Sequence, residues 1–241
     1  MSVIILFLAV IGVIAAWWLS HQRLMAKPWL EAGPIGDVPQ AGRSSQPPAK
    51  IGLGIFLVVA GALFTLLLSA YFMRMQMGDW RPLPVPALLW FNTFVLILSS
   101  VALQWAQVAA RRDDFEGMTF GLLGAGVTSL AFLVGQIVAW RQLVEAGYGL
   151  ATNPANSFFY VLTAAHGLHV VGGIVALGRT AVKAWRSETA SQARLSIELC
   201  AIYWHFLLLV WLILFGLLLM EPGDSFADFL VRCIQSIPGT R

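Results

Sequence analysis

The chain has 241 residues, of which 59% are hydrophobic and only 11% are charged. Soluble domains carry about 25% charged residues, so this composition excludes a water-soluble globular protein. The net charge is +3, but the basic residues lie almost entirely between apolar runs. There they set membrane topology, and they do not indicate nucleic-acid binding. The composition therefore predicts an integral membrane protein.

Six apolar stretches are long enough to cross a bilayer as helices, which takes about 20 residues each. In chain order they are 3–19, 51–73, 85–110, 118–140, 158–177 and 197–220. We therefore predict an all-α, polytopic membrane helix bundle of about six transmembrane helices. Its predicted parts are an N-terminal transmembrane helix at 1–20, a Pro-rich cytoplasmic loop at 21–50, a transmembrane bundle at 51–220 and a short C-terminal interfacial segment at 221–241.

The first stretch is either a retained helix or a cleaved signal peptide. It has no positively charged start and its apolar run is long, which argues against a signal peptide. Trp17 and Trp18 at its end suit a membrane interface. These features favour a retained helix.

The distribution of basic residues between the loops predicts an orientation. Ten of the fifteen Lys and Arg residues follow the first, third and fifth stretches. Because loops rich in Lys and Arg stay in the cytoplasm, we expect these three loops inside the cell and both termini outside. The predicted location is the inner (plasma) membrane.

Few ionisable groups lie at membrane depth, and each is a candidate functional residue because its burial in hydrocarbon is costly. His166 and His169 are three residues apart and therefore share one helix face. With His205 they form either a set of haem or copper ligands or, as we favour, neutral side chains that hydrogen-bond between helices. No Asp or Glu in the core of any span would orient them as ligands, and Cys200 and Cys233 form no C-x-x-C pair.

Glu198, near the start of the last stretch, has several possible roles. It is either a proton carrier, a lipid-headgroup contact, or a residue that stabilises the helix dipole and pairs with Arg194 four residues earlier. We favour the dipole and ion-pair interpretation.

Small and aromatic residues in the spans predict packing and interface roles. The glycines allow close helix approach, and they are Gly121, Gly124, Gly126, Gly167, Gly172 and Gly173. The tryptophans are expected mostly near helix ends or on the bundle surface as interface anchors, and they are Trp90, Trp105, Trp140, Trp204 and Trp211. The chain contains no P-loop, H-E-x-x-H or G-x-S-x-G motif, so no catalytic site is indicated.

Five short motifs follow one another between about Gly52 and Leu219. They are Ser69-Ala70-Tyr71-Phe72 with Arg74, then Leu89-Trp90-Phe91-Asn92-Thr93 with Ser99-Ser100, then Ala165-His166-Gly167-Leu168-His169-Val170 with Gly172-Gly173, then Glu198, then Tyr203-Trp204-His205-Phe206 with Val210-Trp211. In this order they resemble the subunit III family of haem–copper oxidases.

The resemblance implies a non-catalytic subunit of an aerobic terminal oxidase of the cytochrome c oxidase type. Such a subunit holds no redox metal, packs against the catalytic subunit, binds phospholipid in a cleft between helix bundles and supports proton uptake. The haem and copper would belong to subunits I and II, which are the expected partners together with phospholipid. The resemblance makes five residues candidates for internal polar contacts or for the lipid cleft: His166, His169, His205, Glu198 and Trp204.

The sequence also departs from the family pattern. The family often has seven helices, so the resemblance implies that the first is absent here and that 3–19 takes the place of the second. A buried Glu of the third family helix corresponds to Ala60 or an apolar neighbour, and an Asp that follows the Y-W-H-F motif corresponds to Leu208. A proton-linked role through those carboxylates is therefore not expected.

Two other functions are compatible with the sequence. An accessory subunit of a nitric oxide reductase would share this fold. A small transporter is disfavoured, because transporters tend to have internal repeats, broken helices and ionisable groups at the midplane. This chain has unbroken spans and, at depth, only neutral histidines.

Overall fold

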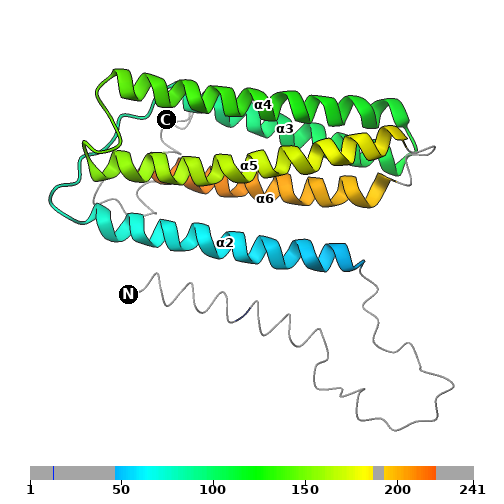
Figure 1. The fold of residues 1–241 in the computed structure, drawn as a ribbon, viewed down its shortest axis with the longest axis horizontal. Coiled ribbons are helices and arrows are strands. Elements are labelled where there is room, and N and C mark those ends of the chain that lie inside the picture. Colours follow the sequence, from blue (N-terminus) through cyan, green and yellow to red (C-terminus); the bar gives the residue numbers. More distant parts are fainter. Residues whose placement is uncertain (1–12, 14–46, 187–192, 221–241) are drawn as a thin grey trace, which may run out of the picture. The chain divides into compact units, whose positions relative to one another are not determined.

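The computed structural model describes residue 13 and residues 47–186 and 193–220. The described part is all-helical, with no strand, which confirms the predicted fold class (Figure 1). Its helices are α2 (Pro48–Met75), α3 (Leu88–Arg111), α4 (Phe115–Glu145), α5 (Pro154–Arg186) and α6 (Arg194–Leu218). All five are long and apolar enough to span a membrane. Apart from residue 13, the predicted span 3–19 lies outside the described residues, as do the loop up to residue 46 and the segment 221–241.

The chain divides into two compact units, residues 1–55 and residues 56–241. Within the first unit, residues 48–55 form the first turns of α2. The second unit holds the rest of α2 and the four helices that follow. The contacts between helices that build the bundle lie within this second unit.

Several helices extend beyond the apolar stretches that predicted them. The stretch 158–177 is the core of α5, which has 33 residues and is therefore about 50 Å long. The hydrocarbon core of a bilayer is only about 30 Å thick, so the polar ends of α5 reach into the headgroup region. At the start of α4, the Asp114 carboxylate accepts a hydrogen bond from the backbone N–H of Gly117 (3.0 Å) and caps the helix.

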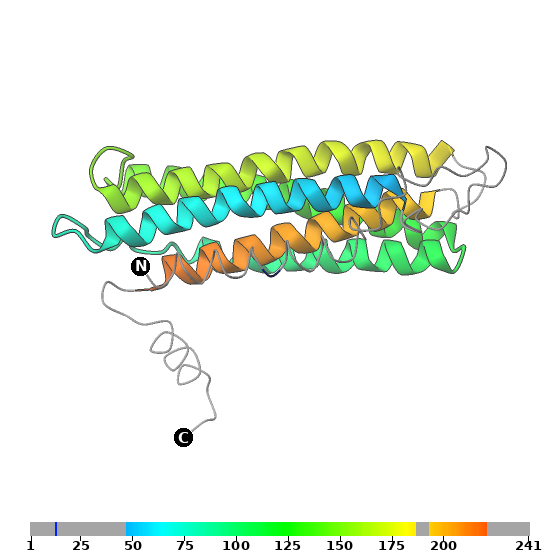
Figure 2. The same ribbon diagram turned by 90° about the horizontal axis from the view of Figure 1, so that it is seen from below.

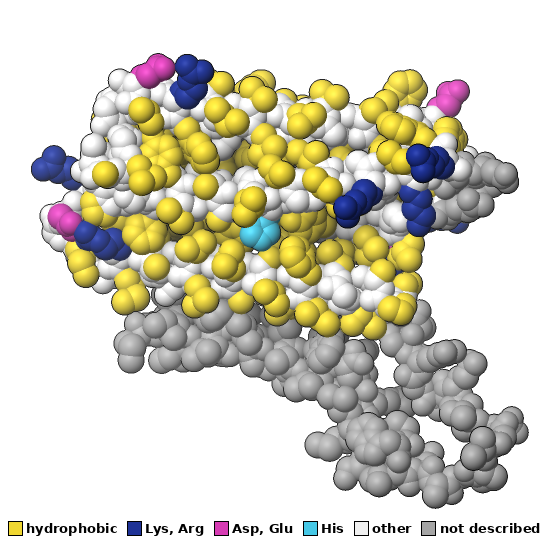
Figure 3. Space-filling view, in the orientation of Figure 1, with side chains coloured by type: hydrophobic (Ala, Val, Ile, Leu, Met, Phe, Trp, Pro, Cys, Tyr) yellow, Lys and Arg dark blue, Asp and Glu magenta, His cyan; other side chains and the backbone are white. Residues whose placement is uncertain are grey.

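The middle of the molecular surface is apolar. In Figure 3, charged side chains lie toward the ends of the helices and apolar side chains cover most of the face between them. Phe120 and Leu168 are among the most exposed apolar residues, at 72% and 71%. Such a surface is stable only against hydrocarbon or another apolar protein surface.

Aromatic and aliphatic side chains join α2 to α5 and α6. Phe64 and Tyr71 of α2 are buried in a cluster with Leu162 of α5 and Val210 and Leu214 of α6. Figures 1 and 2 both show α2 running beside these two helices. Because the bridging side chains are large, α2 joins the bundle without close backbone contact.

The helices α3 and α4 approach each other much more closely. A Cβ atom added at Gly121 of α4 would lie 2.8 Å from the carbonyl oxygen of Ala102 and 2.8 Å from the Cβ of Ala106, both in α3. A side chain at this position would therefore collide with backbone. The prediction that small residues allow close helix approach is thus confirmed at Gly121, but it is wrong for Gly172, where an added Cβ would meet nothing within 4 Å.

The expectation that the tryptophans lie mostly at the surface is wrong for Trp204 and Trp211. Both indoles are 0% exposed and lie at the centre of the bundle, whereas Trp90 and Trp105 are exposed. The indole N–H of each buried tryptophan donates to a hydroxyl group of another helix. These bonds satisfy the only polar atom of each indole. The rings can therefore be buried without the free-energy cost of an unpaired hydrogen-bond donor.

Arg194, the first residue of α6, binds the end of α3. Its Nε donates to the carbonyl of Ala110 (2.8 Å), and its Nη2 donates to the carbonyl of Arg111 (3.2 Å) and to the carboxylate of Asp113 (2.8 Å). Asp113 has a positive φ of 55°, a conformation that Asp tolerates better than most residues. One guanidinium thus satisfies two C-terminal carbonyls of α3 and fixes the α3–α4 turn.

Replacing Arg194 by alanine is expected to lower the free energy of unfolding by about 1–2 kcal/mol, because three charge-assisted hydrogen bonds at a partly exposed site are lost. Arg186→Ala is the matched control, because Arg186 is exposed at the end of α5 and its replacement removes the same charge. The measurement is SDS-induced unfolding of the full chain in mixed micelles. Equal losses in the two variants would contradict the specific role of Arg194.

Candidate functional site

A layer of hydroxyl groups and one indole joins three helices at the centre of the bundle. The Nε1 of Trp204 (α6) donates to the Oγ of Ser99 (α3) at 2.9 Å and of Ser129 (α4) at 3.2 Å. The two serine hydroxyls lie 2.7 Å apart, and Ser129 also donates to the carbonyl of Ala125 (2.6 Å). All three side chains are fully buried, so the layer fixes the relative rotation of α3, α4 and α6.

Two further polar contacts lie along α3. Trp211 donates through Nε1 to the Oγ1 of Thr93 (2.9 Å). The Nδ2 of Asn92 lies 3.5 Å from the Oε1 of Gln136 in α4. Gly135 makes room for this amide pair, because a Cβ at that position would collide with the Asn92 carboxamide.

His166 is completely buried and bonds to a backbone group of another helix. Its Nε2 donates to the carbonyl of Leu207 in α6 (3.0 Å). The ring lies 5.0 Å from that of Trp211 and 5.7 Å from that of Phe132, between centroids. Because Nε2 already donates to a carbonyl, only Nδ1 retains a lone pair, and it has no hydrogen-bond partner within the described residues.

His169 lies on the face of α5 that packs against α2. Its ring centroid is 5.2 Å from that of Phe64, which also lies 6.4 Å from His166, as the shared helix face predicts. The Nδ1 of His169 donates to the carbonyl of Ala165 in its own helix (2.8 Å). The carbonyl of His169 in turn accepts a hydrogen bond from the hydroxyl of Tyr203 (2.9 Å). This residue therefore contributes to the contact of α5 with both α2 and α6.

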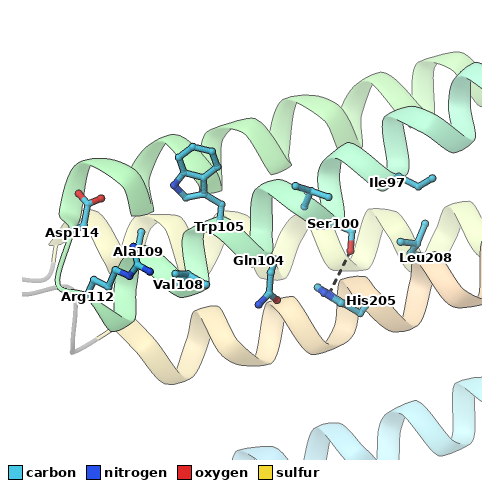
Figure 4. Close-up of a pocket in the computed structure, with 11 residues that line it drawn as sticks. Ile97, Ser100, Gln104, Trp105, Val108, Ala109, Arg112, Asp114, His205 and Leu208 are labelled. Carbon is cyan, nitrogen blue, oxygen red and sulfur yellow. Dashed lines mark hydrogen bonds between the residues drawn. The ribbon is translucent and has the colours of Figure 1, made fainter.

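His205 lies on the outside of the bundle, although it follows Trp204 directly. Its side chain is exposed and lines a groove of about 690 Å³ between α3 and α6. The Nδ1 donates to the carbonyl of Ala201 (2.6 Å) and lies 3.4 Å from the Oγ of Ser100 across the groove (Figure 4). His205 is thus directed away from the layer around Trp204.

Glu198 is partly buried in the second turn of α6. The predicted partner, Arg194, directs its guanidinium to Asp113 and to two carbonyls of α3. The three possible roles of Glu198 therefore stay predictions.

The three histidines do not form a ligand set. His166 and His169 lie within the bundle, against the rings of Trp211 and Phe64, whereas His205 faces outward. In the part of the chain that the structure describes, no three His, Cys, Asp or Glu side chains come together as a metal site would require. The geometry of these residues does not fit a haem or copper centre.

A second groove, of about 590 Å³, lies between α4 and α5 at the other end of the bundle. Apolar side chains including Ile137, Val144 and Val161 line it, and Arg141 and Glu145 contribute charged groups. Its tyrosine, Tyr160, donates its hydroxyl hydrogen to the carbonyl of Tyr148 (3.0 Å). The groove therefore combines an apolar wall with a cation near the membrane surface.

The sequence interpretation missed the hydroxyl partners of the tryptophans, namely Thr93, Ser99 and Ser129. Their only signal is the presence of small hydroxyl residues within apolar spans, where an unpaired hydroxyl is unfavourable. Which indole each one accepts from depends on how the helices are rotated against one another. The sequence of a single helix does not determine that rotation.

Comparison with known proteins gives the family. Residues 42–220 match the family model for cytochrome c oxidase subunit III. The chain is 36% identical over 180 residues to cytochrome c oxidase subunit 3 of Thermostichus vulcanus, covering 70% of this chain and 85% of that protein. It is 34% identical over 213 residues to cytochrome c oxidase subunit 3 of Synechocystis sp., covering 80% and 88%.

A third relative combines two subunit names. Over 127 residues the chain is 32% identical to the heme-copper oxidase subunit I+III of Aeropyrum pernix, covering 52% of this chain and 16% of that protein. Neither alternative, the nitric oxide reductase subunit or the transporter, gains support from these comparisons. The five motifs, the helical bundle and the similarity over most of the chain agree, and the chain belongs to the cytochrome c oxidase subunit III family, as a multi-pass membrane subunit of a terminal oxidase.

Proposed function

We propose that this chain is a non-catalytic subunit that stabilises the haem-bearing subunit of its oxidase. The observation that carries the proposal is the use of the polar motif residues within the chain itself. His166 bonds to the Leu207 carbonyl and Trp204 to Ser99 and Ser129. The bond of Trp204 uses the only polar atom of its indole, and in the described part of the chain no group of three His, Cys, Asp or Glu side chains surrounds His166 to hold a metal.

Subunits I and II are the proposed partners, and the haem and copper of the complex would lie in them. The similarity to a protein named heme-copper oxidase subunit I+III supports subunit I as the direct neighbour. The broad apolar surface of the described helices is compatible with such a neighbour within the membrane.

Phospholipid is a further proposed ligand, and the α4–α5 groove is the place that suits it. The apolar wall formed by Ile137, Val144 and Val161 fits an acyl chain, and the guanidinium of Arg141 suits a phosphate. The candidates His166 and Trp204 are fully buried, so their proposed role is internal contact and not lipid binding.

The proposed location is the plasma membrane, with the α3–α4 turn in the cytoplasm. Arg111 and Arg112 at this turn support that orientation through the positive-inside rule. We also propose that the chain supports proton uptake. The two family carboxylates that correspond to Ala60 and Leu208 cannot contribute, because both positions are apolar here.

The proposal is tested by purifying the tagged chain in mild detergent and then separating it from its partners. We expect the intact complex to show haem absorbance, and the separated chain to contain neither haem nor copper by visible spectrum and metal analysis. Stoichiometric haem or copper in the separated chain would refute a non-catalytic role. Absence of any haem protein from the intact preparation would refute membership of an oxidase complex in this cell.

A further inference from the structure

The groove between α3 and α6 exposes polar groups at the depth of the hydrocarbon core. His205 is the twelfth of the 25 residues of α6, and Gln104 lies about seven residues, or roughly 10 Å, before the end of α3. Both side chains are exposed. Acyl chains offer no hydrogen bonds, so exposed polar groups at this depth are unfavourable against lipid.

These groups retain unused hydrogen-bonding capacity. Nδ1 of His205 donates to the Ala201 carbonyl, so Nε2 of the neutral ring is an acceptor. No described residue hydrogen-bonds to the carboxamide of Gln104, which Figure 4 shows beside the gap between α3 and α6. The groove therefore offers its occupant one hydrogen-bond acceptor, Nε2 of His205, and one carboxamide, that of Gln104.

The cytoplasmic end of the groove adds a positive charge. Arg112 lines it there and has no ion-pair partner among the described residues. The neighbouring carboxylate, Asp114, is already used as the N-cap of α4. An occupant that matches the groove thus carries hydrogen-bonding side chains opposite His205 and Gln104 and an acidic group near the membrane surface.

We propose that the α3–α6 groove seats a transmembrane helix of the haem-bearing partner subunit, with polar side chains opposite His205 and Gln104 and an acidic one opposite Arg112. This inference rests on the proposed function. A phospholipid would satisfy Arg112 through its phosphate but would leave His205 and Gln104 against acyl chains. A protein helix satisfies all three, and the apolar walls formed by Ile97, Val101 and Trp105 supply the packing surface.

Photo-cross-linking in the assembled complex tests the site without altering its polar groups. p-Benzoylphenylalanine is placed at Val101 in the groove or, as a control, at Val134 on the outer face of α4; these valines are 56% and 61% exposed. Irradiation of native membranes is expected to join the chain to the haem-bearing subunit, identified by mass spectrometry, from Val101 and not from Val134. Adducts of Val101 with phospholipid alone, or with a second copy of this chain, would overturn the proposal.

A second measurement tests the polar contacts themselves. Gln104→Leu and His205→Leu keep the approximate size of the side chain and are each expected to raise the dissociation constant from the haem-bearing subunit about threefold to tenfold. Haem retained by the tagged chain is measured against detergent concentration, with Val134→Leu as control. Unchanged retention in both variants would refute the contacts. Co-purification of haem with the unaltered chain, without a Val101 cross-link, would refute the groove while leaving the proposed function intact.

Discussion

Replacing Trp204 by alanine is expected to lower the free energy of unfolding by about 3–5 kcal/mol, which is a large fraction of the stability of a membrane bundle. The indole is fully buried, so its removal leaves a cavity among α3, α4, α5 and α6. It also removes the donor on which the hydroxyls of Ser99 and Ser129 converge. Gly173 of α5 packs against the same ring, so closely that a Cβ added at Gly173 would lie 2.8 Å from the indole of Trp204.

Two control variants separate packing from hydrogen bonding at this position. Trp204→Phe keeps a ring but loses the N–H, and an interhelical hydrogen bond in a membrane protein is worth about 0.6 kcal/mol on average, so most of the stability should remain. Trp185→Ala removes an exposed indole at the end of α5 and is expected to cost less than about 0.5 kcal/mol. SDS titration of the full chain measures all three. A loss under about 1 kcal/mol for Trp204→Ala would show that the indole is not central to the bundle.

Replacing Gly121 by alanine is expected to cost about 1–3 kcal/mol or more, because the added methyl group collides with the backbone of α3. The nearest atoms, at 2.8 Å, are the carbonyl oxygen of Ala102 and the backbone nitrogen and Cβ of Ala106. Backbone atoms in a helix cannot rotate away as the end of a long side chain can. The two helices must therefore separate, which strains the α3–α4 turn and the contacts of Ser99 and Ser129.

The matched control is Gly124→Ala, three residues along α4. A Cβ there meets the Cβ of Ala102 at 3.6 Å, an ordinary van der Waals contact. Since alanine also favours a helix over glycine, this variant should be neutral or slightly stabilising. Thermal unfolding of the full chain in detergent compares the pair. If Gly121→Ala were as stable as Gly124→Ala, the close approach of α3 and α4 would be incorrect.

The sequence by itself determined the class of fold, the five described spans and the family. Uninterrupted apolar stretches can only be spanning helices in a bilayer, and the order of the five motifs identifies the family without any coordinates. The predicted helix ends were less accurate, and the predicted stretch for α5 was too short at both ends. Polar residues continue this helix into the headgroup region, where hydropathy no longer indicates a helix. Of the first predicted span, the structure describes only residue 13.

Only the tertiary structure decided which side of each helix faces inward. Trp204 and His205 are neighbours in one motif, yet the indole is fully buried and the imidazole lies on the outer surface. Gly121 and Gly124 are likewise indistinguishable in the sequence, but only at Gly121 would an added Cβ collide with the backbone of α3. The physical reason is that lipid is as apolar as the bundle interior, so hydrophobicity does not separate inside from outside. The rotation of each helix is set by close packing and by hydroxyl partners on other helices, which lie far away in the sequence.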